Sequence, residues 1–142
     1  MFEYEYPRAA ITADIIVFLR EESSVKILLI KRGAYPYKNM WALPGGFMDM
    51  DETIETTAIR ELEEETTLKN IKLKQLYTFS EINRDPRHRT VSVVFYGFTY
   101  KNNCNVIGSD DAAEAKWFDI TNLPELAFDH KKIVDFAVET IL

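Results

Sequence analysis

Three glutamates near the middle of the chain have a spacing that suits a metal site. Glu61, Glu64 and Glu65 occupy positions i, i+3 and i+4, so on an α-helix their carboxylates share one edge. Like charges at this spacing destabilise a helix. A hard divalent cation reverses the repulsion, because Mg²⁺ prefers oxygen ligands and often shares them with substrate phosphates. The pattern therefore predicts a cation site, with a solvated helix face as the alternative.

The residues before these glutamates extend the pattern. The flexible Gly45-Gly46 turn could bring a backbone carbonyl to the same cation. From Gly46 the chain runs through five residues, Glu52, seven residues, Arg60-Glu61-Leu62, one residue, Glu64-Glu65, two residues and Leu68. This spacing resembles the Nudix box. Eight of the nine defined box positions match, and Thr67 stands where the family has glycine.

The resemblance implies both a fold and a reaction. The fold is the Nudix α/β/α sandwich with a mixed sheet, and the reaction is hydrolysis of a pyrophosphate bond with Mg²⁺ or Mn²⁺. In the family's pattern Glu61, Glu64 and Glu65 bind metal or activate water, and Arg60 holds Glu61 in orientation. Glu52 would support the site by hydrogen bonding, although it could also simply precede a helix cap. The box thus implies a catalytic set (Glu52, Arg60, Glu61, Glu64, Glu65) and three metal ligands among its glutamates. With the Gly46 carbonyl and a candidate from outside the box, the expected metal-binding set is Gly46, Glu61, Glu64, Glu65 and Glu114.

Four stretches outside the box resemble the ADP-ribose pyrophosphatase branch of the family. They cover residues 6–18, 31–47, 84–97 and 110–134, so the resemblance extends over nearly the whole chain. It implies that the substrate is a small nucleotide, with ADP-ribose cleaved to AMP and ribose 5-phosphate. Water would attack phosphorus in line, while metal ions bridge phosphate oxygens.

Several polar residues in these flanking stretches are candidates for substrate or metal contact. Guanidinium groups suit phosphate recognition, so we expect substrate contacts from Arg32, Arg84, Arg87 and Arg89; a plain surface arginine and a solvated turn are the alternatives. Glu114 is a candidate for an extra metal ligand or base, and Asp110 and Asp111 compete for that role. Asp14 interrupts an apolar strand, and it is either a hydrogen-bonded structural residue or part of the site. Phe128 and His130 could contact substrate, although packing and helix capping explain them better.

The hydrophobic pattern predicts elements that could hold these residues in place. We expect a hairpin of strands 11–19 and 25–30, a loop over 33–39, and strands 72–80, 90–100 and 115–118. The central helix should run over 54–66 with Thr53 as its N-cap, and a last helix over 130–142 with Asp129 as its cap. Strands around a central helix and a final helix indicate an α/β protein. At Thr67 the helix either ends in a strained left-handed cap, or the chain leaves the helix in another conformation.

Composition and charge narrow the class of protein. The 142 residues, 46% of them apolar, suit a single domain over 1–142 with a real core. The net charge of −6 disfavours nucleic-acid binding. The longest apolar run, Ile15 to Leu19, is far shorter than the roughly 20 residues of a membrane span. The N-terminus does not resemble a signal peptide, and Cys104 stands alone. We therefore expect a cytoplasmic protein without a membrane or nucleic-acid partner, with a homodimer as one option.

The sequence also leaves two other functions open. One is a pool-sanitising hydrolase that cleaves nucleoside triphosphates. The other is a ligand-sensing module, since related domains occur fused to a DNA-binding winged helix. The box carboxylates are intact and the chain stops at Leu142, directly after the last expected helix. We therefore expect an enzyme without such an appended module.

Overall fold

The computed structural model describes residues 1–100 and 112–142. In chain order the elements are β1 (Ala10–Arg20), β2 (Val25–Arg32), β3 (Trp41–Ala42), β4 (Gly45–Phe47), α1 (Ile54–Thr66), β5 (Lys74–Phe79), β6 (Thr90–Tyr100), β7 (Ala112–Asp119) and α2 (His130–Ile141). Asp110, Asp111 and Cys104 lie outside the described residues. None of the described helices is long and apolar enough to cross a membrane.

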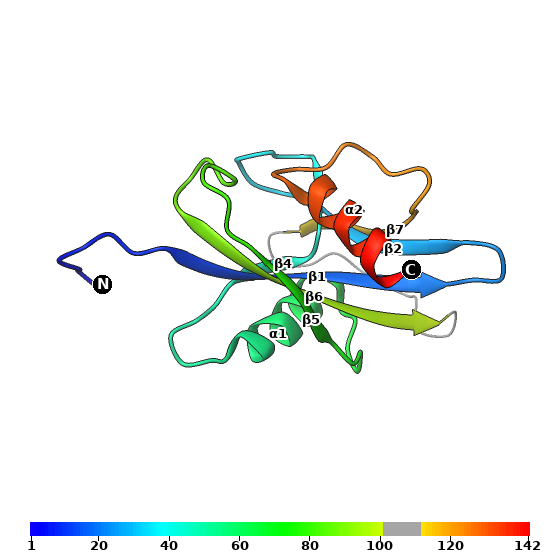
Figure 1. Cartoon of the computed structure of the whole chain (residues 1–142), viewed down its shortest axis with the longest axis horizontal. Coiled ribbons are helices and arrows are strands. Elements are labelled where there is room, and N and C mark those ends of the chain that lie inside the picture. The colour runs from blue at the N-terminus through cyan, green and yellow to red at the C-terminus, as the bar shows by residue number, and fades with distance from the viewer. Residues whose placement is uncertain (101–111) are drawn as a thin grey trace.

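Strand β1 is the centre of a mixed sheet with the order β3-β2-β1-β6-β5 (Figure 1). One edge of β1 pairs in parallel with β6 from Ala10 to Arg20. The other edge is shared, because β4 pairs with residues 12–14 and β2 forms the expected hairpin with residues 18–20. The sheet therefore splits beside the middle of β1, and β4 leads from the split toward α1.

Both faces of the sheet are covered, which explains the unbroken apolar pattern of β1. Ile15 and Val17 pack with Ala58 and Leu62 of α1 on one face. Ile16 and Phe18 point to the opposite face, where they pack with α2. Figure 1 shows the two helices on opposite sides of the sheet. The chain has the expected α/β/α architecture.

Helix α1 begins with the predicted N-cap at Thr53 and ends in a left-handed C-cap at Thr67. The Oγ1 of Thr53 accepts a hydrogen bond of 3.2 Å from the Thr56 N–H. At the other end Thr67 has φ 64°, and its N–H donates to the carbonyl of Glu63 at 2.9 Å. Thr67 thus adopts the left-handed cap although it is β-branched, and Leu68 still reaches the core. Of the two conformations that the sequence left open at Thr67, the chain adopts the strained left-handed one.

The remaining predictions hold with shifted bounds and one correction. The short strands β3 and β4 were not expected, and β7 is longer than the predicted 115–118. Asp129 does occupy the N-cap position of α2, but its side chain makes no capping hydrogen bond. Its carboxylate binds Arg84 instead, at 2.7 and 2.9 Å. Arg84 is a cation that binds both carboxylate oxygens at once, which is stronger than a bond from a neutral backbone N–H, so the arginine takes the carboxylate.

Candidate functional site

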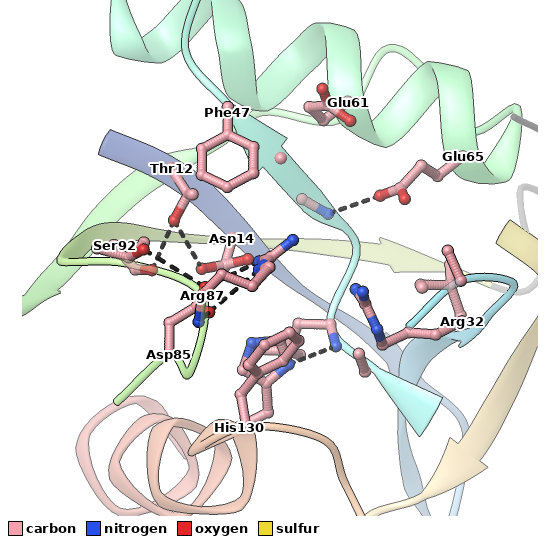
Figure 2. Close-up of a pocket in the computed structure, with 18 of the residues that line it drawn as sticks. Thr12, Asp14, Arg32, Phe47, Glu61, Glu65, Asp85, Arg87, Ser92 and His130 are labelled. Carbon is pink, nitrogen blue, oxygen red and sulfur yellow. Dashed lines mark hydrogen bonds and ion pairs between the residues drawn. The ribbon is translucent and has the colours of Figure 1, made fainter. Parts of the chain in front are cut away.

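A cavity of about 400 Å³ opens where the sheet splits beside β1. Figure 2 shows Glu61 and Glu65 of α1 on one side of it and His130 at the start of α2 on the other. Arginine side chains line a further part of the wall. Thr12, Asp14 and Ser92 contribute polar groups from β1 and β6. The cavity therefore brings together acidic, basic and neutral polar groups from both ends of the chain.

The Gly45-Gly46 pair lets strand β4 pass directly against the glutamates of α1. A Cβ atom on Gly46 would lie only 2.5 Å from the carboxyl carbon of Glu61. The N–H of Gly45 donates to Glu65 Oε1 at 2.7 Å. Only glycine at position 46 leaves room for the Glu61 carboxylate. The backbone N–H of Gly45 fixes the carboxylate of Glu65.

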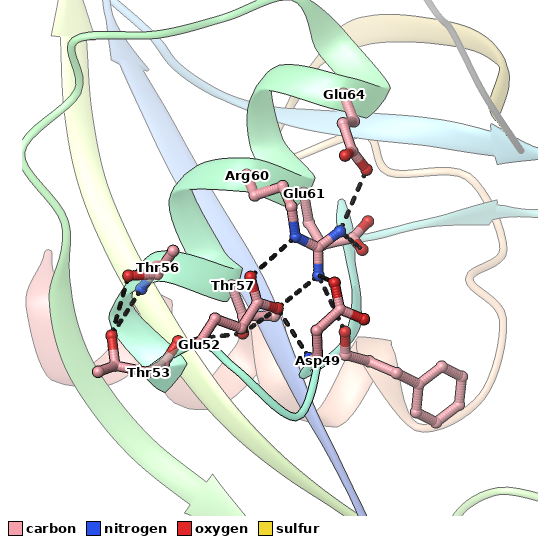
Figure 3. Close-up of polar contacts among 9 residues, drawn as sticks. Asp49, Glu52, Thr53, Thr56, Thr57, Arg60, Glu61 and Glu64 are labelled. Carbon is pink, nitrogen blue, oxygen red and sulfur yellow. Dashed lines mark hydrogen bonds and ion pairs between the residues drawn. The ribbon is translucent and has the colours of Figure 1, made fainter. Parts of the chain in front are cut away.

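Arg60 connects the other charged residues of the box (Figure 3). Its Nε and Nη2 donate to the two oxygens of Glu52 at 3.0 and 2.6 Å. Its Nη1 donates to Glu61 at 2.7 Å and to Glu64 at 3.2 Å. A further bond of 3.0 Å goes to the carbonyl of Phe47 on β4. Arg60 therefore joins the loop, the helix and strand β4, and it fixes the carboxylate of Glu61.

The two carboxylates joined by Arg60 have opposite pKa shifts. The Arg60 hydrogen bonds, with a backbone bond from Asp49, lower the pKa of Glu52 to about 2. Burial raises the pKa of Glu61, and Arg60 offsets this only in part. The pKa of Arg60 itself rises because it donates to Glu52. Arg60 thus favours the charged form of Glu52, whereas burial disfavours the charged form of Glu61, which a nearby cation would stabilise.

The candidate metal ligands differ in how close they lie to the cavity. Glu61 and Glu65 line it, together with Gly46. Glu64 is on the same helix but 43% exposed, and it binds Arg60. Glu114 is exposed on β7 opposite Lys31 and does not belong to the cavity lining. Within residues 1–100 and 112–142, no three acidic, histidine or cysteine side chains form a preassembled metal shell.

The four candidate arginines also take different positions. Arg32 donates from Nε to the Pro36 carbonyl at 2.8 Å, and Arg87 binds Asp85 through two nitrogens. Both line the cavity, as does Arg84, whose side chain is only 5% exposed. Arg89 donates to the carbonyls of Ser80 and Glu81 and is not part of the lining.

One aromatic ring stands between two of these arginines. The guanidinium carbons of Arg32 and Arg87 lie 4.9 and 5.3 Å from the ring centre of Phe128. Arg87 also lies 5.3 Å from the ring of Phe47. Phe128 has φ 53°, a left-handed conformation that is unfavourable for a bulky residue. Such strain is typical of residues held in place at functional sites.

The floor of the cavity is polar and is formed by Thr12, Asp14, Ser92 and His130. The sequence provided only weak signals for these residues. Thr12 and Ser92 join through their hydroxyls at 2.6 Å, and Arg84 Nη1 donates to Ser92 at 2.7 Å. Asp14 proves to be buried and to line the cavity. His130 is buried at the start of α2, where burial lowers its pKa. The available signal was the pair Thr12 and Asp14, two polar residues on one face at the start of an apolar strand.

Comparison with known proteins agrees with this architecture. A family model described as NUDIX domain matches residues 9–136. An ADP-ribose pyrophosphatase from Methanocaldococcus jannaschii is 43% identical over 134 residues, covering 91% of this chain and 73% of that protein. The ADPR responsive transcriptional repressor NtrR from Acinetobacter baylyi is 32% identical; the match covers 94% of this chain but 54% of the repressor. The chain thus spans about half the length of that relative.

A solved structure of a NUDIX domain is also similar to this chain. The NUDIX domain of Shewanella oneidensis NrtR, determined in complex with ADP ribose, superposes with a TM-score of 0.87 at 30% identity. The match covers 96% of this chain and 91% of that domain. The chain belongs to the Nudix family.

Proposed function

We propose that this protein is a metal-dependent pyrophosphohydrolase that cleaves ADP-ribose to AMP and ribose 5-phosphate. The observation that carries the proposal is the position of Glu61 against Gly46 and of Glu65 against Gly45, on the wall of a cavity that also contains arginines. Carboxylates that hold a cation and guanidinium groups that bind phosphate are the two requirements for pyrophosphate cleavage. The similarity to an ADP-ribose pyrophosphatase and to an ADP-ribose-bound domain supports the choice of substrate.

The residues present suit a magnesium or manganese ion. Two carboxylates beside an open cavity provide the hard oxygen donors that such ions prefer, and Mg²⁺ usually takes only one or two from protein. A cation would also favour the charged form of Glu61, whose pKa is raised by burial. Glu61 and Glu65 would hold the ion, with Glu64 and the Gly46 carbonyl as further donors. When bound, the ion would activate water and offset charge on the phosphates.

The surrounding residues would hold these groups in place. Arg60 fixes the Glu61 carboxylate, and Glu52 in turn fixes Arg60 through two hydrogen bonds. The Gly45 N–H orients Glu65. Arg32 and Arg87 of the cavity lining would bind the pyrophosphate, and Arg84 would hold part of the wall through its bonds to Asp129 and Ser92. Arg89 and Glu114, both outside the cavity lining, would act only if substrate extends beyond it.

The test is release of AMP from ADP-ribose in the presence of Mg²⁺, measured by chromatography beside a panel of nucleoside triphosphates. Glu65→Gln keeps an oxygen that can accept the Gly45 bond but removes the charge. We expect its turnover to fall at least 10²-fold, the scale of losing a major electrostatic contribution. Glu63→Gln, on the exposed side of the same helix, is the matched control. Activity of Glu65→Gln within threefold of the natural protein would exclude Glu65 as an essential ligand.

A second candidate function follows from the similarity to the ADPR responsive repressor. A ligand-sensing domain would bind ADP-ribose and leave it intact. Calorimetric binding of ADP-ribose without AMP release would favour this sensor over the enzyme. Faster cleavage of a nucleoside triphosphate would instead favour a pool-sanitising hydrolase.

A further inference from the structure

Asp14 is a buried carboxylate with little to satisfy it inside the protein. It exposes only 7% of its surface, and it lines the cavity. Within the described part of the chain its side-chain hydrogen bond comes from Thr12 Oγ1 at 3.3 Å. The same hydroxyl makes a much shorter contact with Ser92, at 2.6 Å. Buried carboxylates ordinarily accept several hydrogen bonds, so Asp14 retains acceptor capacity directed at the cavity.

His130 supplies a donor on the same floor. Its Nδ1 accepts a hydrogen bond of 3.0 Å from the Leu43 N–H. A ring nitrogen that accepts carries no proton, so in the neutral ring the proton lies on Nε2. Across residues 1–100 and 112–142, no hydrogen bond from Nε2 is found. His130 is 5% exposed and lines the same cavity as Asp14. Burial lowers the pKa of its imidazole, and the charge of Asp14 acts in the opposite direction.

The charges along the cavity decide which part of a substrate can reach this floor. A pyrophosphate carries only acceptor oxygens, so the Asp14 carboxylate repels it and the arginines attract it. Of the groups on a nucleotide substrate, an uncharged donor therefore suits Asp14, and an acceptor suits His130 Nε2. A vicinal diol meets both requirements, because each hydroxyl both donates and accepts. One hydroxyl can donate to Asp14 while the other accepts from His130 Nε2.

We infer that Asp14 and His130 form a ribose-binding subsite in which Asp14 accepts a hydrogen bond from the sugar diol. The inference rests on the proposed function and adds a specificity residue to it. ADP-ribose contains two ribose rings, and either one supplies this chemistry. Asp14 would then select a ribosyl substrate over a deoxyribosyl one, while the box residues carry out hydrolysis.

The experiment measures binding of the two proposed products, which are not turned over. Dissociation constants for AMP and ribose 5-phosphate, and for their 2- and 3-deoxy analogues, are measured by calorimetry with Mg²⁺ present. Asp14→Asn keeps the shape and removes the charge. Asp135→Asn makes the same change on the exposed side of α2, where Asp135 binds Lys131, and serves as the control. Thermal melts establish that both variants are folded.

For the natural protein we expect a loss of roughly 10- to 100-fold when the ring in the subsite lacks a hydroxyl, the effect of removing a hydrogen bond to a charged group. Asp14→Asn should bind the ribosyl ligand more weakly by a similar factor and no longer distinguish it from the deoxy analogue. An effect confined to AMP would place the nucleoside ribose in the subsite, and one confined to ribose 5-phosphate would place the terminal ribose there. Asp135→Asn should match the natural protein.

Two results would overturn the inference. One is a natural protein that binds ribosyl and deoxyribosyl ligands equally, which needs no variant to establish. The other is an Asp14→Asn variant that weakens both kinds of ligand by the same factor, as a purely structural residue would. Absence of AMP release from ADP-ribose, by contrast, would refute the proposed hydrolysis and leave the binding comparison intact.

Discussion

The contact between Gly46 and Glu61 offers a sharp test of how the site is built. In Gly46→Ala the new methyl group would lie 2.5 Å from the Glu61 carboxyl carbon and Oε1, and 2.7 Å from Oε2. An ordinary contact of a Cβ atom is 3.4 Å or longer, so the carboxyl must retreat by about 0.9 Å. The obstacle is the end of a flexible side chain, so the backbone has no need to move.

The size of the effect follows from this displacement. Moving the carboxylate strains or breaks its 2.7 Å bond to Arg60 and takes it away from the proposed cation. A misplacement of about 1 Å in a catalytic group can reduce the rate about 10²-fold. We therefore expect kcat/KM of Gly46→Ala to fall by about that factor, with a melting temperature close to that of the natural protein. Gly45→Ala should behave differently, because its Cβ would lie 2.3 Å from the Ala13 carbonyl and should destabilise the fold.

The assay is AMP release from ADP-ribose with Mg²⁺, combined with a double-mutant cycle. Glu61→Ala removes the obstacle, so Gly46→Ala should have almost no additional effect in that background. A Gly46→Ala protein with kcat/KM within threefold of the natural value would refute the reasoning. A full additional loss in the Glu61→Ala background would show that the glycine acts through something else.

Three further predictions follow from the caps and charges. Thr67→Gly relieves the left-handed strain at φ 64° and should raise stability by about 1 kcal/mol; an unchanged or lower thermal midpoint would contradict this. The folded pKa of Glu52, about 2, is below its ordinary 4.5, so its contribution to stability is full above pH 4.5 and is lost as the pH falls toward 2. Arg60→Gln should therefore lose less stability over that window in urea unfolding; parallel pH profiles would be evidence against the pairing. Arg87→Lys should lower kcat/KM about tenfold because a point charge cannot reproduce a guanidinium fork, whereas Arg89→Lys should not, and equal effects would count against the cavity assignment.

Local features could be predicted from the sequence because they depend on neighbours along the chain. The spacing of Glu61, Glu64 and Glu65 fixes their angular positions on any α-helix. The cap at Thr53 is a contact over three residues, and the buried positions Ala58 and Leu62 follow the helical period. The family resemblance added the sandwich architecture, which the fold confirms.

Several features depended on the tertiary structure, because they join residues far apart in sequence. The register of the sheet and the packing of α2 bring Asp14 and His130 to one floor. The same packing gives Arg84 an internal partner in Asp129, 45 residues away. Nothing in the local sequence distinguishes Arg84 from Arg89, although only one of them faces the cavity.

Gly46 shows in a single residue what the sequence determines and what the tertiary structure decides. The sequence identified Gly46 as part of the motif and suggested backbone freedom as its reason. The structure shows a different reason, because the Glu61 carboxylate occupies the space that a side chain would need. Spacing along a helix is set by covalent geometry, so the sequence determines it. Contact between a strand and a helix is set by how their surfaces pack, and only the folded chain decides it.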